Sequence, residues 1–519
     1  MTDLIRQSVL TRRSMIGALG GAAVANFMPY TPAIAQSARR DLKIGTFGGD
    51  FGNLSPVVRW DIQAGLPMLN IFDGLVRTDY KNRKILPWLA EEWSNPDPTT
   101  WRIKIREGVR WHHGYGEMTA EDVVYTWMYH LESKSFQVGI AMFAIDSVKA
   151  DGKYVVEVKT KRPFGAFPGV TMGYGGMIVS GKAHKEMGNQ AYSAKPIGQG
   201  PYMLETSRGN ELELVRNPDY WRPGYPKLDK LFYRAVPDSS VRLQALDRGE
   251  FDFMSHPDPK EVKAFSENKG FSVTRTPGWN WDFQQFNLRI DAQSPFQNKL
   301  VRQAVSYAID REAIVNEIYS GEATVTDNQI PQGYLGFRQS LMRYPKNGDL
   351  EKARQLMAQA GLQGAEVEVV TSDKDWLRRE LELVAAMVSQ IGINYKIRNL
   401  DIGGFNNLWF NKTYPNNLED VTLVAPDPDA MWWHLHSKGS TSGSVNPTMD
   451  GLLDTAREET DPAKREQLYH QVVDLTLEEC PMLFHCNVNY IHVFNEKLRG
   501  FTPSPQEFME IHDGTTWAS

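Results

Sequence analysis

The chain is 519 residues long, with 41% hydrophobic residues, 23% charged residues and a formal net charge of −6 at pH 7. This length exceeds the size at which one hydrophobic core keeps growing, so we expect two or three domains of a globular protein. The mild acidic excess argues against nucleic acid as a partner, because phosphate binding requires a basic face.

The first 35 residues have the pattern of an export signal. Thr11-Arg12-Arg13-Ser14 precedes a short glycine-rich apolar run, and Ala33-Ile34-Ala35 provides a small-x-small cleavage site. This combination is typical of a twin-arginine signal peptide. No later apolar run approaches the roughly 20 residues needed to cross a bilayer. The sequence therefore predicts a signal peptide over 1–35 and a periplasmic mature protein, with an uncleaved membrane anchor as the alternative.

The next part of the chain combines short strands with helices. Alternating apolar residues predict strands over 42–47, 101–106 and 154–160. Helices are predicted over 66–75 and 119–131, the second opened by a capping box of Thr119 and Asp122. Gly48 to Gly52 is expected to form a loop whose backbone can approach another molecule closely. These pieces indicate a small α+β domain at about 66–199.

Nothing in the sequence predicts catalysis, a cofactor or a metal site. Gly176 to Lys182 is similar to a phosphate-binding loop, but Ala183 stands where the magnesium-binding hydroxyl is needed, so we interpret it as a strand end before a helix. No nucleophile elbow and no dinucleotide fingerprint are present. The pairs His112-His113 and His434-x-His436 each lack a nearby third ligand.

The segment from Ala194 to Phe253 predicts a meander of short strands and one helix. Strands are expected over 202–204, 211–215 and 230–236, the first two joined by a turn at 207–210. Ser239 is expected to cap a helix that ends at Gly249, after which 251–254 is extended again.

Longer amphipathic segments follow. One helix is predicted over 298–320 and another after Asp349, and a strand, a helix and a strand are predicted over 367–371, 377–390 and 395–400. A last helix starts at Asp461-Pro462 and stops at Pro481. Strands that alternate with helices predict a parallel sheet, and hence a large α/β lobe at 276–489.

The two cysteines, Cys480 and Cys486, are predicted to be buried free thiols. Residues 481–487 read as a strand, which would hold the two Cα atoms beyond disulfide reach. Their spacing with His485 and His492 matches no usual zinc pattern.

Several motifs resemble the peptide/nickel family of solute-binding proteins that serve ABC importers. They are PIGQGPY from Pro196, RNPDYW from Arg216, LDRGEFD from Leu246, LPWLAEEW from Leu86, IREGVRWH from Ile105, TAEDVVY from Thr119 and VRQAVSYAIDR from Val301. The resemblance spans roughly 42–503. It implies a periplasmic-binding-protein type II fold of the α/β class, with two lobes around a ligand cleft and an extra α+β domain.

The resemblance also implies a division of the chain and a role. The first lobe would collect 37–65, 200–275 and 490–519, beside the extra domain at 66–199 and the second lobe at 276–489. The protein would be a monomeric binding protein without enzymatic activity or cofactor. It would capture a small polar molecule or peptide by closing the lobes and deliver it to an ABC permease and ATPase complex.

Candidate ligand-binding residues follow from the same resemblance. Trp279, Asn280 and Trp281 follow a domain crossover, and Trp433 follows Asp427-Pro428-Asp429, which is similar to a cleft-wall motif of the family. Trp376 and Arg379 lie where the family places a loop and helix start facing the ligand, and Asp427 and Arg379 are the candidate charged anchors. Asp50 in the glycine loop is a further candidate, as a hydrogen-bonding group. Core packing is the alternative for one or two of the aromatic residues at 279–283.

One departure bears on the ligand. Peptide binders of the family carry an acidic residue three positions before the D-P-D motif, where it holds the ligand's amino group; Val424 stands there in this chain. A buried ammonium without a partner is costly, so a free-amine dipeptide is disfavoured. Tryptophan walls suit sugars, aromatic acids, opine-like compounds, modified peptides and quaternary amines. The alternatives to an importer component are a ligand-sensing accessory protein and a twin-arginine-exported redox enzyme.

Overall fold

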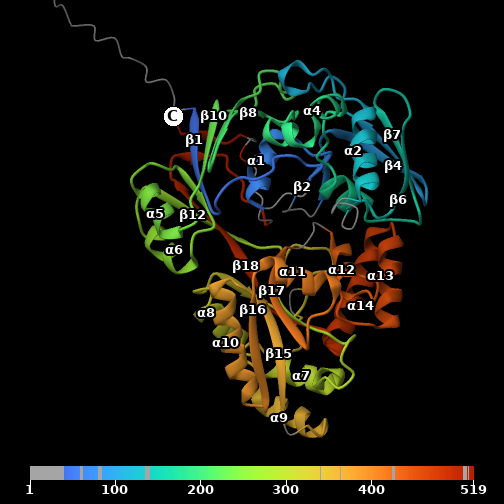
Figure 1. Ribbon diagram of the computed structural model, residues 1–519, viewed down its shortest axis with the longest axis vertical. Helices are drawn as coiled ribbons and strands as arrows, with labels where there is room; N and C mark the ends of the chain where they lie inside the picture. The colour runs from blue at the N-terminus through green and yellow to red at the C-terminus, as the bar shows by residue number, and fades with distance from the viewer. Residues whose placement is uncertain are drawn as a thin grey trace, which may run out of the picture. The chain divides into compact units, whose positions relative to one another are not determined.

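The computed structural model describes residues 40–519 except 59–61, 80–83, 135–140, 339–340, 363, 424–426, 506–510, 512–513 and 519, as the ribbon in Figure 1 shows. The predicted signal peptide and Val424 lie outside the described residues. Two large hydrophobic cores organise the described chain, one between Leu42 and Ile511 and one between Trp279 and Cys486. We call the parts built on them the N-terminal lobe and the C-terminal lobe.

Strand β1 (Asp41–Thr46) is the centre of the N-terminal lobe. It pairs in parallel with β10 (Lys230–Ala235) and with β11 (Phe253–Ser255), and β9 (Glu211–Arg216) and β8 (Tyr202–Arg208) extend the sheet antiparallel. Helix α5 (Ser239–Asp247) packs against β1 and β11, and helix α6 (Pro259–Ser266) follows β11 in the chain. The strands predicted here are confirmed, but the cap of α5 is Asp238 rather than Ser239, because the Asp238 carboxylate accepts the Val241 N–H at 2.9 Å.

A separate four-stranded antiparallel sheet belongs to the same lobe. Its order is β4 (Ala90–Asp97), β5 (Thr100–Ile105), β7 (Val155–Thr160) and β6 (Ile145–Ala150), and α2 (Ala120–Ser133) packs on it. The predicted capping box at the start of α2 is present, since the Thr119 N–H donates to Asp122 Oδ2 at 2.9 Å. The other elements are α1 (Ile62–Ile71), β2 (Val76–Asp79), β3 (Lys84–Pro87), η1 (His112–Gly114), α3 (Phe167–Gly169), η3 (Val170–Tyr174) and α4 (Gly181–Ala194). Residues 176–180 are not a strand; Ser180 caps α4 instead.

The C-terminal lobe has the predicted parallel strands. β15 (Ala365–Ser372) pairs in parallel with β16 (Ile393–Leu400) and β17 (Asn417–Leu423). Val367, Val369 and Val370 are buried, as expected of a strand covered on both faces. β13 (Asn280–Phe286) and β14 (Ala323–Val325) are antiparallel to their neighbours, so the sheet is mixed. The later α-helices of this lobe are α9 (Leu350–Gln359), α10 (Asp375–Ser389), α11 (Ile402–Asn411), α12 (Met431–Leu435), α13 (Pro447–Glu458) and α14 (Pro462–Glu479).

The single long helix predicted over 298–320 is wrong. Two helices, α7 (Lys299–Ala308) and α8 (Arg311–Glu317), replace it. Ile309 between them is extended, and the Asp310 carboxylate accepts the Ala313 N–H at 2.9 Å, which starts a new helix. An aspartate competes with the helical backbone in this way because its short side chain reaches the amides that follow it.

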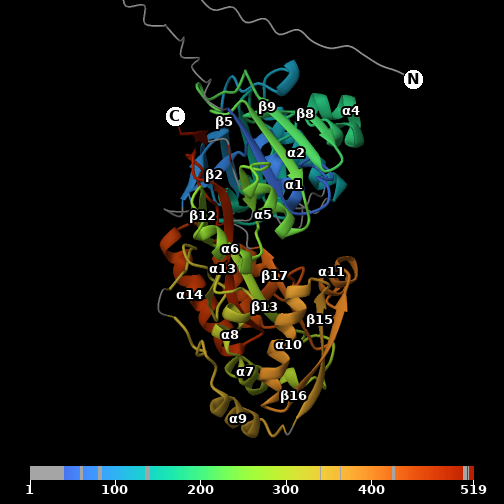
Figure 2. The same cartoon turned by 90° about the vertical axis from the view of Figure 1, so that its left-hand side faces the viewer.

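Strand β18 (Met482–Asn495) belongs to both lobes. Its first half pairs with β13 and β14, and its second half lies between β11 and β12 (Phe271–Pro277). Figure 2 shows this strand running from one lobe into the other. The short pair β19 (Leu498–Arg499) and β20 (Thr516–Trp517) follows it. One hydrogen-bonded sheet therefore passes through both lobes.

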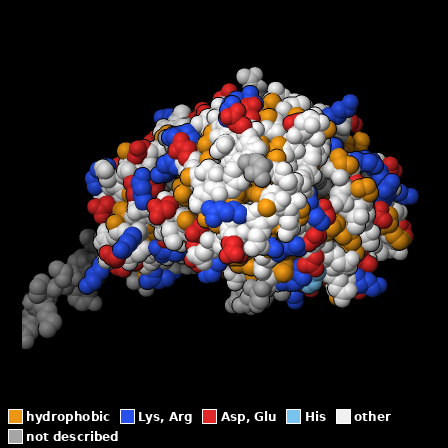
Figure 3. Space-filling view, turned by 90° about the horizontal axis from the view of Figure 1, so that it is seen from below, with side chains coloured by type: hydrophobic (Ala, Val, Ile, Leu, Met, Phe, Trp, Pro, Cys, Tyr) orange, Lys and Arg blue, Asp and Glu red, His pale blue; other side chains and the backbone are white. Residues whose placement is uncertain are grey.

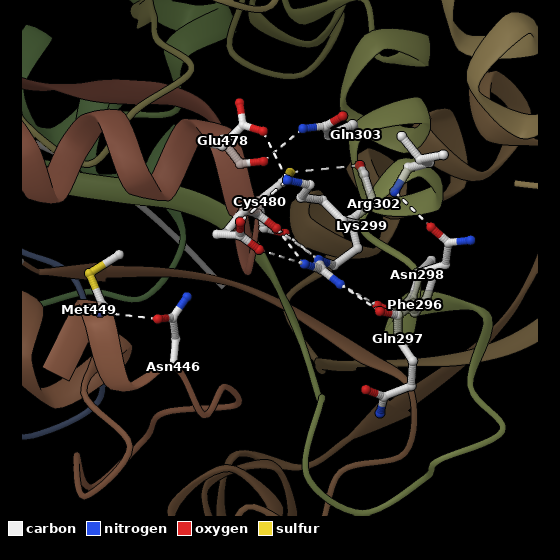
Figure 4. Close-up of polar contacts among 12 residues, drawn as sticks. Phe296, Gln297, Asn298, Lys299, Arg302, Gln303, Asn446, Met449, Glu478 and Cys480 are labelled. Carbon is white, nitrogen blue, oxygen red and sulfur yellow. Dashed lines mark hydrogen bonds and ion pairs between the residues drawn. The ribbon is translucent and has the colours of Figure 1, made fainter. Parts of the chain in front are cut away.

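A buried arginine ties α7 to the end of α14. The guanidinium of Arg302 donates to the carbonyl oxygens of Phe296, Gln297, Glu479 and Cys480 (Figure 4). The Cys480 thiol lies 3.7 Å from the Arg302 carbonyl oxygen, and the Cys486 thiol donates to Asp282 Oδ2 at 3.2 Å. Both cysteines are buried and free, which confirms the prediction from strand spacing.

Acidic and basic side chains are interspersed among the described residues on the face in Figure 3, without an extended basic patch. No helix in the described part of the chain is both long and apolar enough to cross a bilayer.

Candidate ligand-binding site

The sheet of the C-terminal lobe brings several predicted site residues to one edge. β15 and β17 are parallel, so their carboxyl ends meet there; Trp376 and Arg379 follow β15, and Asp427 and Trp433 follow β17. β13 runs the other way and begins at this edge, where Asn280 pairs with Leu423. Ligands of open α/β sheets bind beyond the carboxyl ends of the strands, so the topology makes this edge the candidate site.

In the N-terminal lobe the equivalent edge carries the glycine loop. β1, β10 and β11 are parallel, and the loop from Gly48 to Gly52 directly follows β1. Gly48 and Gly52 both have positive φ, which glycine tolerates without strain. Asp50 between them is exposed, and its Oδ1 accepts the Gly52 N–H at 3.1 Å.

The three residues at the start of β13 are engaged inside the protein. The Trp281 ring is 1% exposed, packs on His434 and Phe484, and donates its N–H to the Gln329 carbonyl oxygen at 2.8 Å. Trp279 is 3% exposed and its ring N–H donates to the Gln332 carbonyl oxygen at 3.2 Å. The structure therefore gives Trp281 a core position.

The side chain of Asn280 links two strands through hydrogen bonds. Its side-chain amide donates to the Val488 carbonyl oxygen and accepts the Val488 N–H, both at 2.8 Å. This pair of bonds joins β13 to β18, where the sheet passes between the lobes.

The carboxylates of the D-P-D motif are each paired with an arginine, buried in the case of Arg465 and half-buried in the case of Arg457. Arg465 on α14 holds Asp427 with two hydrogen bonds, and Arg457 on α13 holds Asp429 at 2.7 and 2.8 Å. Burial alone would lower the pKa of Arg465, but the charge of Asp427 raises it above its ordinary value. The negative charge of Asp427 is thus neutralised within the lobe. Sequence reasoning missed both arginines, because nothing local links them to the motif.

Trp376, Trp433 and Arg379 retain exposed surface. Trp376 is half-buried beside Tyr319, with ring centroids 5.8 Å apart. Trp433 is also half-buried, and its ring N–H has no hydrogen-bond partner among the described residues. Arg379 is exposed on α10. A hydrogen bond to Asp258 raises the pKa of Lys260 and the Arg379 charge opposes that rise, so Arg379 lies within electrostatic range of α6.

A fully buried polar cluster lies in the same lobe, formed by Asp282 on β13, Glu380 on α10 and His485 on β18. These are the residue types that bind divalent cations, and their ligand atoms lie within 4.8 Å of one another. However, His485 Nδ1 already contacts Glu380 Oε1 at 2.9 Å and lies 3.4 Å from Asp282 Oδ1. Because the ring nitrogen and the Glu380 carboxyl group already form a hydrogen bond with each other, we assign no metal ion to this cluster.

Folding raises the pKa of His485 and Glu380 in this cluster and of Glu419 beside it. Burial would lower the pKa of His485, but its hydrogen bonds to Asp282 and Glu380 raise it to about 10. Burial and the neighbouring Asp282 charge raise the pKa of Glu380 well above its usual value, and burial raises that of Glu419 to about 8. All three groups hold protons in the folded protein over a pH range in which the unfolded chain has lost them.

We therefore expect the free energy of unfolding to fall as the pH rises from about 6.5 to 10. A group whose pKa is higher in the folded than in the unfolded protein stabilises the fold at pH values below its unfolded-state pKa. This stabilisation is lost as the pH rises through the folded-state pKa. The contribution of Glu419 is therefore lost near pH 8 and that of His485 near pH 10. Thermal melting between pH 6.5 and 10 measures this. His485→Asn should be less stable at pH 7 and have a flatter pH dependence. The control is His470→Asn, a half-buried histidine on α14; equal slopes in the two variants would contradict the assignment.

A surface cavity of about 560 Å³ lies elsewhere in the N-terminal lobe. Its lining includes Arg106, Trp221, Arg222 and Tyr225. The Arg106 guanidinium lies 4.3 Å from the Trp221 ring centroid and that of Arg222 4.4 Å from the Tyr225 centroid. These aromatic faces are already covered, so we assign no ligand to this cavity.

Comparison with known proteins identifies the family. Residues 84–443 match the model of the bacterial extracellular solute-binding proteins, family 5 (middle). The chain belongs to this family. It is 24% identical to the dipeptide-binding protein of Escherichia coli over 470 residues, which cover 84% of this chain and 87% of that protein. It is 25% identical to the glutathione-binding protein of Shigella boydii, with 92% and 94% covered.

A solved structure agrees in fold. The PBP AgaA from A. tumefaciens in complex with agropinic acid superposes with a TM-score of 0.76 at 24% identity, covering 89% of this chain and 94% of that one. The α/β fold with two lobes is thereby confirmed. Members of family 5 are extracellular binding proteins for transport rather than enzymes, and this chain is a solute-binding protein of that kind.

Proposed function

We propose that this solute-binding protein captures a small polar ligand between its lobes and delivers it to an ABC permease and ATPase complex. The observation that carries the proposal is the placement of two parallel-strand edges, one in each lobe, on either side of the middle of the shared strand β18. β11 ends at Ser255 opposite His492, and β13 begins at Asn280 beside Val488. Closure of two lobes about a strand of this kind is a hinge motion, which a ligand favours when it contacts both lobes.

The domain division that goes with the proposal has three parts. The first lobe would comprise 37–65, 200–275 and 490–519, the extra domain 66–199 and the second lobe 276–489. The pairing of β1 with β10 and β11, and of β11 with the end of β18, supports gathering distant segments into the first lobe.

The proposed pocket uses Trp376, Trp433, Arg379 and Asp50, with the buried Trp279 and with Asp427 and Asn280 supporting its wall. Half-buried aromatic rings with a few polar groups are what ligand-binding walls in proteins usually contain. Trp281 contributes from the core behind the wall. We propose a peptide-like, opine-like or oligosaccharide-like ligand, since tryptophan faces stack on such molecules. Native mass spectrometry of the protein as purified would give the mass of a trapped ligand; a visible chromophore would instead indicate an exported redox protein.

We expect Trp433→Ala to weaken ligand binding by about 5- to 150-fold. Removing a stacking ring costs about 1–3 kcal/mol, and Trp433 is half-buried, so part of its side chain remains exposed. Calorimetry with the ligand identified by mass measures the change. Trp93→Ala serves as the control, because Trp93 is a half-buried tryptophan on β4, outside the proposed pocket. An unchanged affinity in folded Trp433→Ala would remove Trp433 from the pocket.

We further propose that export uses the twin-arginine route. The support is Arg12-Arg13 ahead of a weak apolar run. Replacing both arginines by lysine should leave the precursor in the cytoplasm, which cell fractionation and immunoblotting would detect. Normal export of the double variant would indicate the general secretory route.

A further inference from the structure

The loop after β7 touches the end of α13, so that the two lobes meet at a second place besides β18. The Gly165 N–H donates a hydrogen bond to the Arg457 carbonyl oxygen at 2.9 Å. A Cβ atom added at Gly165 would lie 1.9 Å from the Glu459 carbonyl oxygen and 2.7 Å from its carbonyl carbon. Such distances are far below any contact between real Cβ atoms and backbone, so only glycine permits this approach.

The Arg457 side chain joins the same two lobes. Its guanidinium carbon lies 4.1 Å from the ring centroid of Trp432 in the C-terminal lobe and 4.4 Å from that of Phe143 in the N-terminal lobe. Asp429, 1% exposed, fixes the plane of the guanidinium through two hydrogen bonds. A planar cation between two aromatic faces is attracted to both, and the attraction grows when water is excluded.

The backbone contact also completes a helix end. Arg457 lies in the last turn of α13, where carbonyl groups have no partner within the helix and carry partial negative charge. An N–H from the other lobe satisfies one of these carbonyls. Nearby, a Cβ at Gly169 would lie 3.3 Å from the Asp427 Cβ, so the N-terminal lobe also approaches the D-P-D motif closely.

We propose that Gly165 and Arg457 form an interlock that holds the two lobes in the closed arrangement, which makes Arg457 a positioning residue for solute capture. This inference rests on the proposed function. A ligand that needs both lobes binds with an apparent affinity reduced by the fraction of molecules that are open. The interlock increases the fraction of molecules whose lobes are closed without contacting the ligand. It therefore increases the apparent affinity for the ligand from outside the pocket.

The test is small-angle X-ray scattering of protein that native mass spectrometry shows to be free of solute. Gly165→Ala places a methyl group against the Glu459 carbonyl and should increase the radius of gyration. Phe143→Leu removes one of the two aromatic rings that contact the Arg457 guanidinium. It should raise the ratio of open to closed molecules about 2- to 30-fold. Gly173→Ala is the matched control, because a Cβ there has its nearest neighbour at 3.9 Å.

The expected result is a wild-type curve that fits residues 40–519 as described, a wild-type value for Gly173→Ala and larger radii for the other two variants. An unchanged radius in folded Gly165→Ala, or a wild-type protein that is already extended, would overturn the interlock. If Gly165→Ala fails to fold, an unchanged radius of gyration in folded Phe143→Leu would overturn the interlock. Because no solute is present, the outcome is independent of the proposed ligand: absence of any binding would refute the function and leave the interlock standing.

Discussion

Asp427→Ala is expected to lower the free energy of unfolding by about 3–5 kcal/mol. The substitution leaves the Arg465 guanidinium, whose side chain is 7% exposed, buried without its counter-charge. Arg465 also donates to Tyr469 and to the Ala456 carbonyl oxygen, so it cannot turn to solvent without breaking these bonds. Urea denaturation at neutral pH measures the loss.

The matched control is Asp461→Ala, which removes an exposed carboxylate that caps α14. It should cost about 1 kcal/mol, as lost helix caps do. A stable Asp427→Ala variant that no longer binds ligand would show that this carboxylate contacts the ligand rather than supporting the wall. The comparison therefore separates the two roles that the D-P-D motif could have.

Arg302→Lys is the second substitution with a large expected effect, a loss of about 3 kcal/mol. Arg302 is 4% exposed and its fork reaches four carbonyl oxygens, including that of Phe296 at 2.7 Å and that of Glu479 at 2.6 Å. A lysine keeps the charge but cannot span these acceptors, and each buried polar group left unpaired costs about 1–3 kcal/mol.

The control for this change is Arg354→Lys on α9. Arg354 donates one exposed hydrogen bond to the Gln390 carbonyl oxygen, and the substitution removes only that bond. Surface substitutions of this kind are usually within about 0.5 kcal/mol of neutral. Chemical denaturation of both variants provides the measurement. Equal stability of Arg302→Lys and wild type would mean that the α7 and α14 ends are held by apolar packing alone.

Local patterns were sufficient for most elements. The alternation of a strand, a helix and a strand over β15, α10 and β16 was predictable because side-chain periodicity and end signals act within a few residues. The predicted helix over 298–320 failed at Asp310, where the carboxylate accepts a following amide and the Arg311 guanidinium turns to the Phe484 carbonyl oxygen at 2.7 Å. That second partner lies 173 residues away, beyond any local signal.

The resemblance to the family named the candidate site residues, and the topology of the sheet explains why several of them lie at one of its edges. The sequence could not tell which of these residues line a binding wall and which belong to the core. Trp279, Trp281 and Phe283 alternate along β13, yet every residue of β13 is buried, since β17 and β18 pair with its two sides and other elements cover both faces. Alternation distinguishes an inner face only when the other face meets water.

The sequence by itself determined the family, the α/β class and the free cysteines. Only the tertiary structure decided the charges: Asp427 is neutralised by Arg465, Asp429 by Arg457, and Asp282 and Glu380 both contact His485. These partners come from separate elements far apart along the chain. A charge buried by folding must find its counter-charge among whatever the fold brings near it, and sequence spacing does not encode that distance.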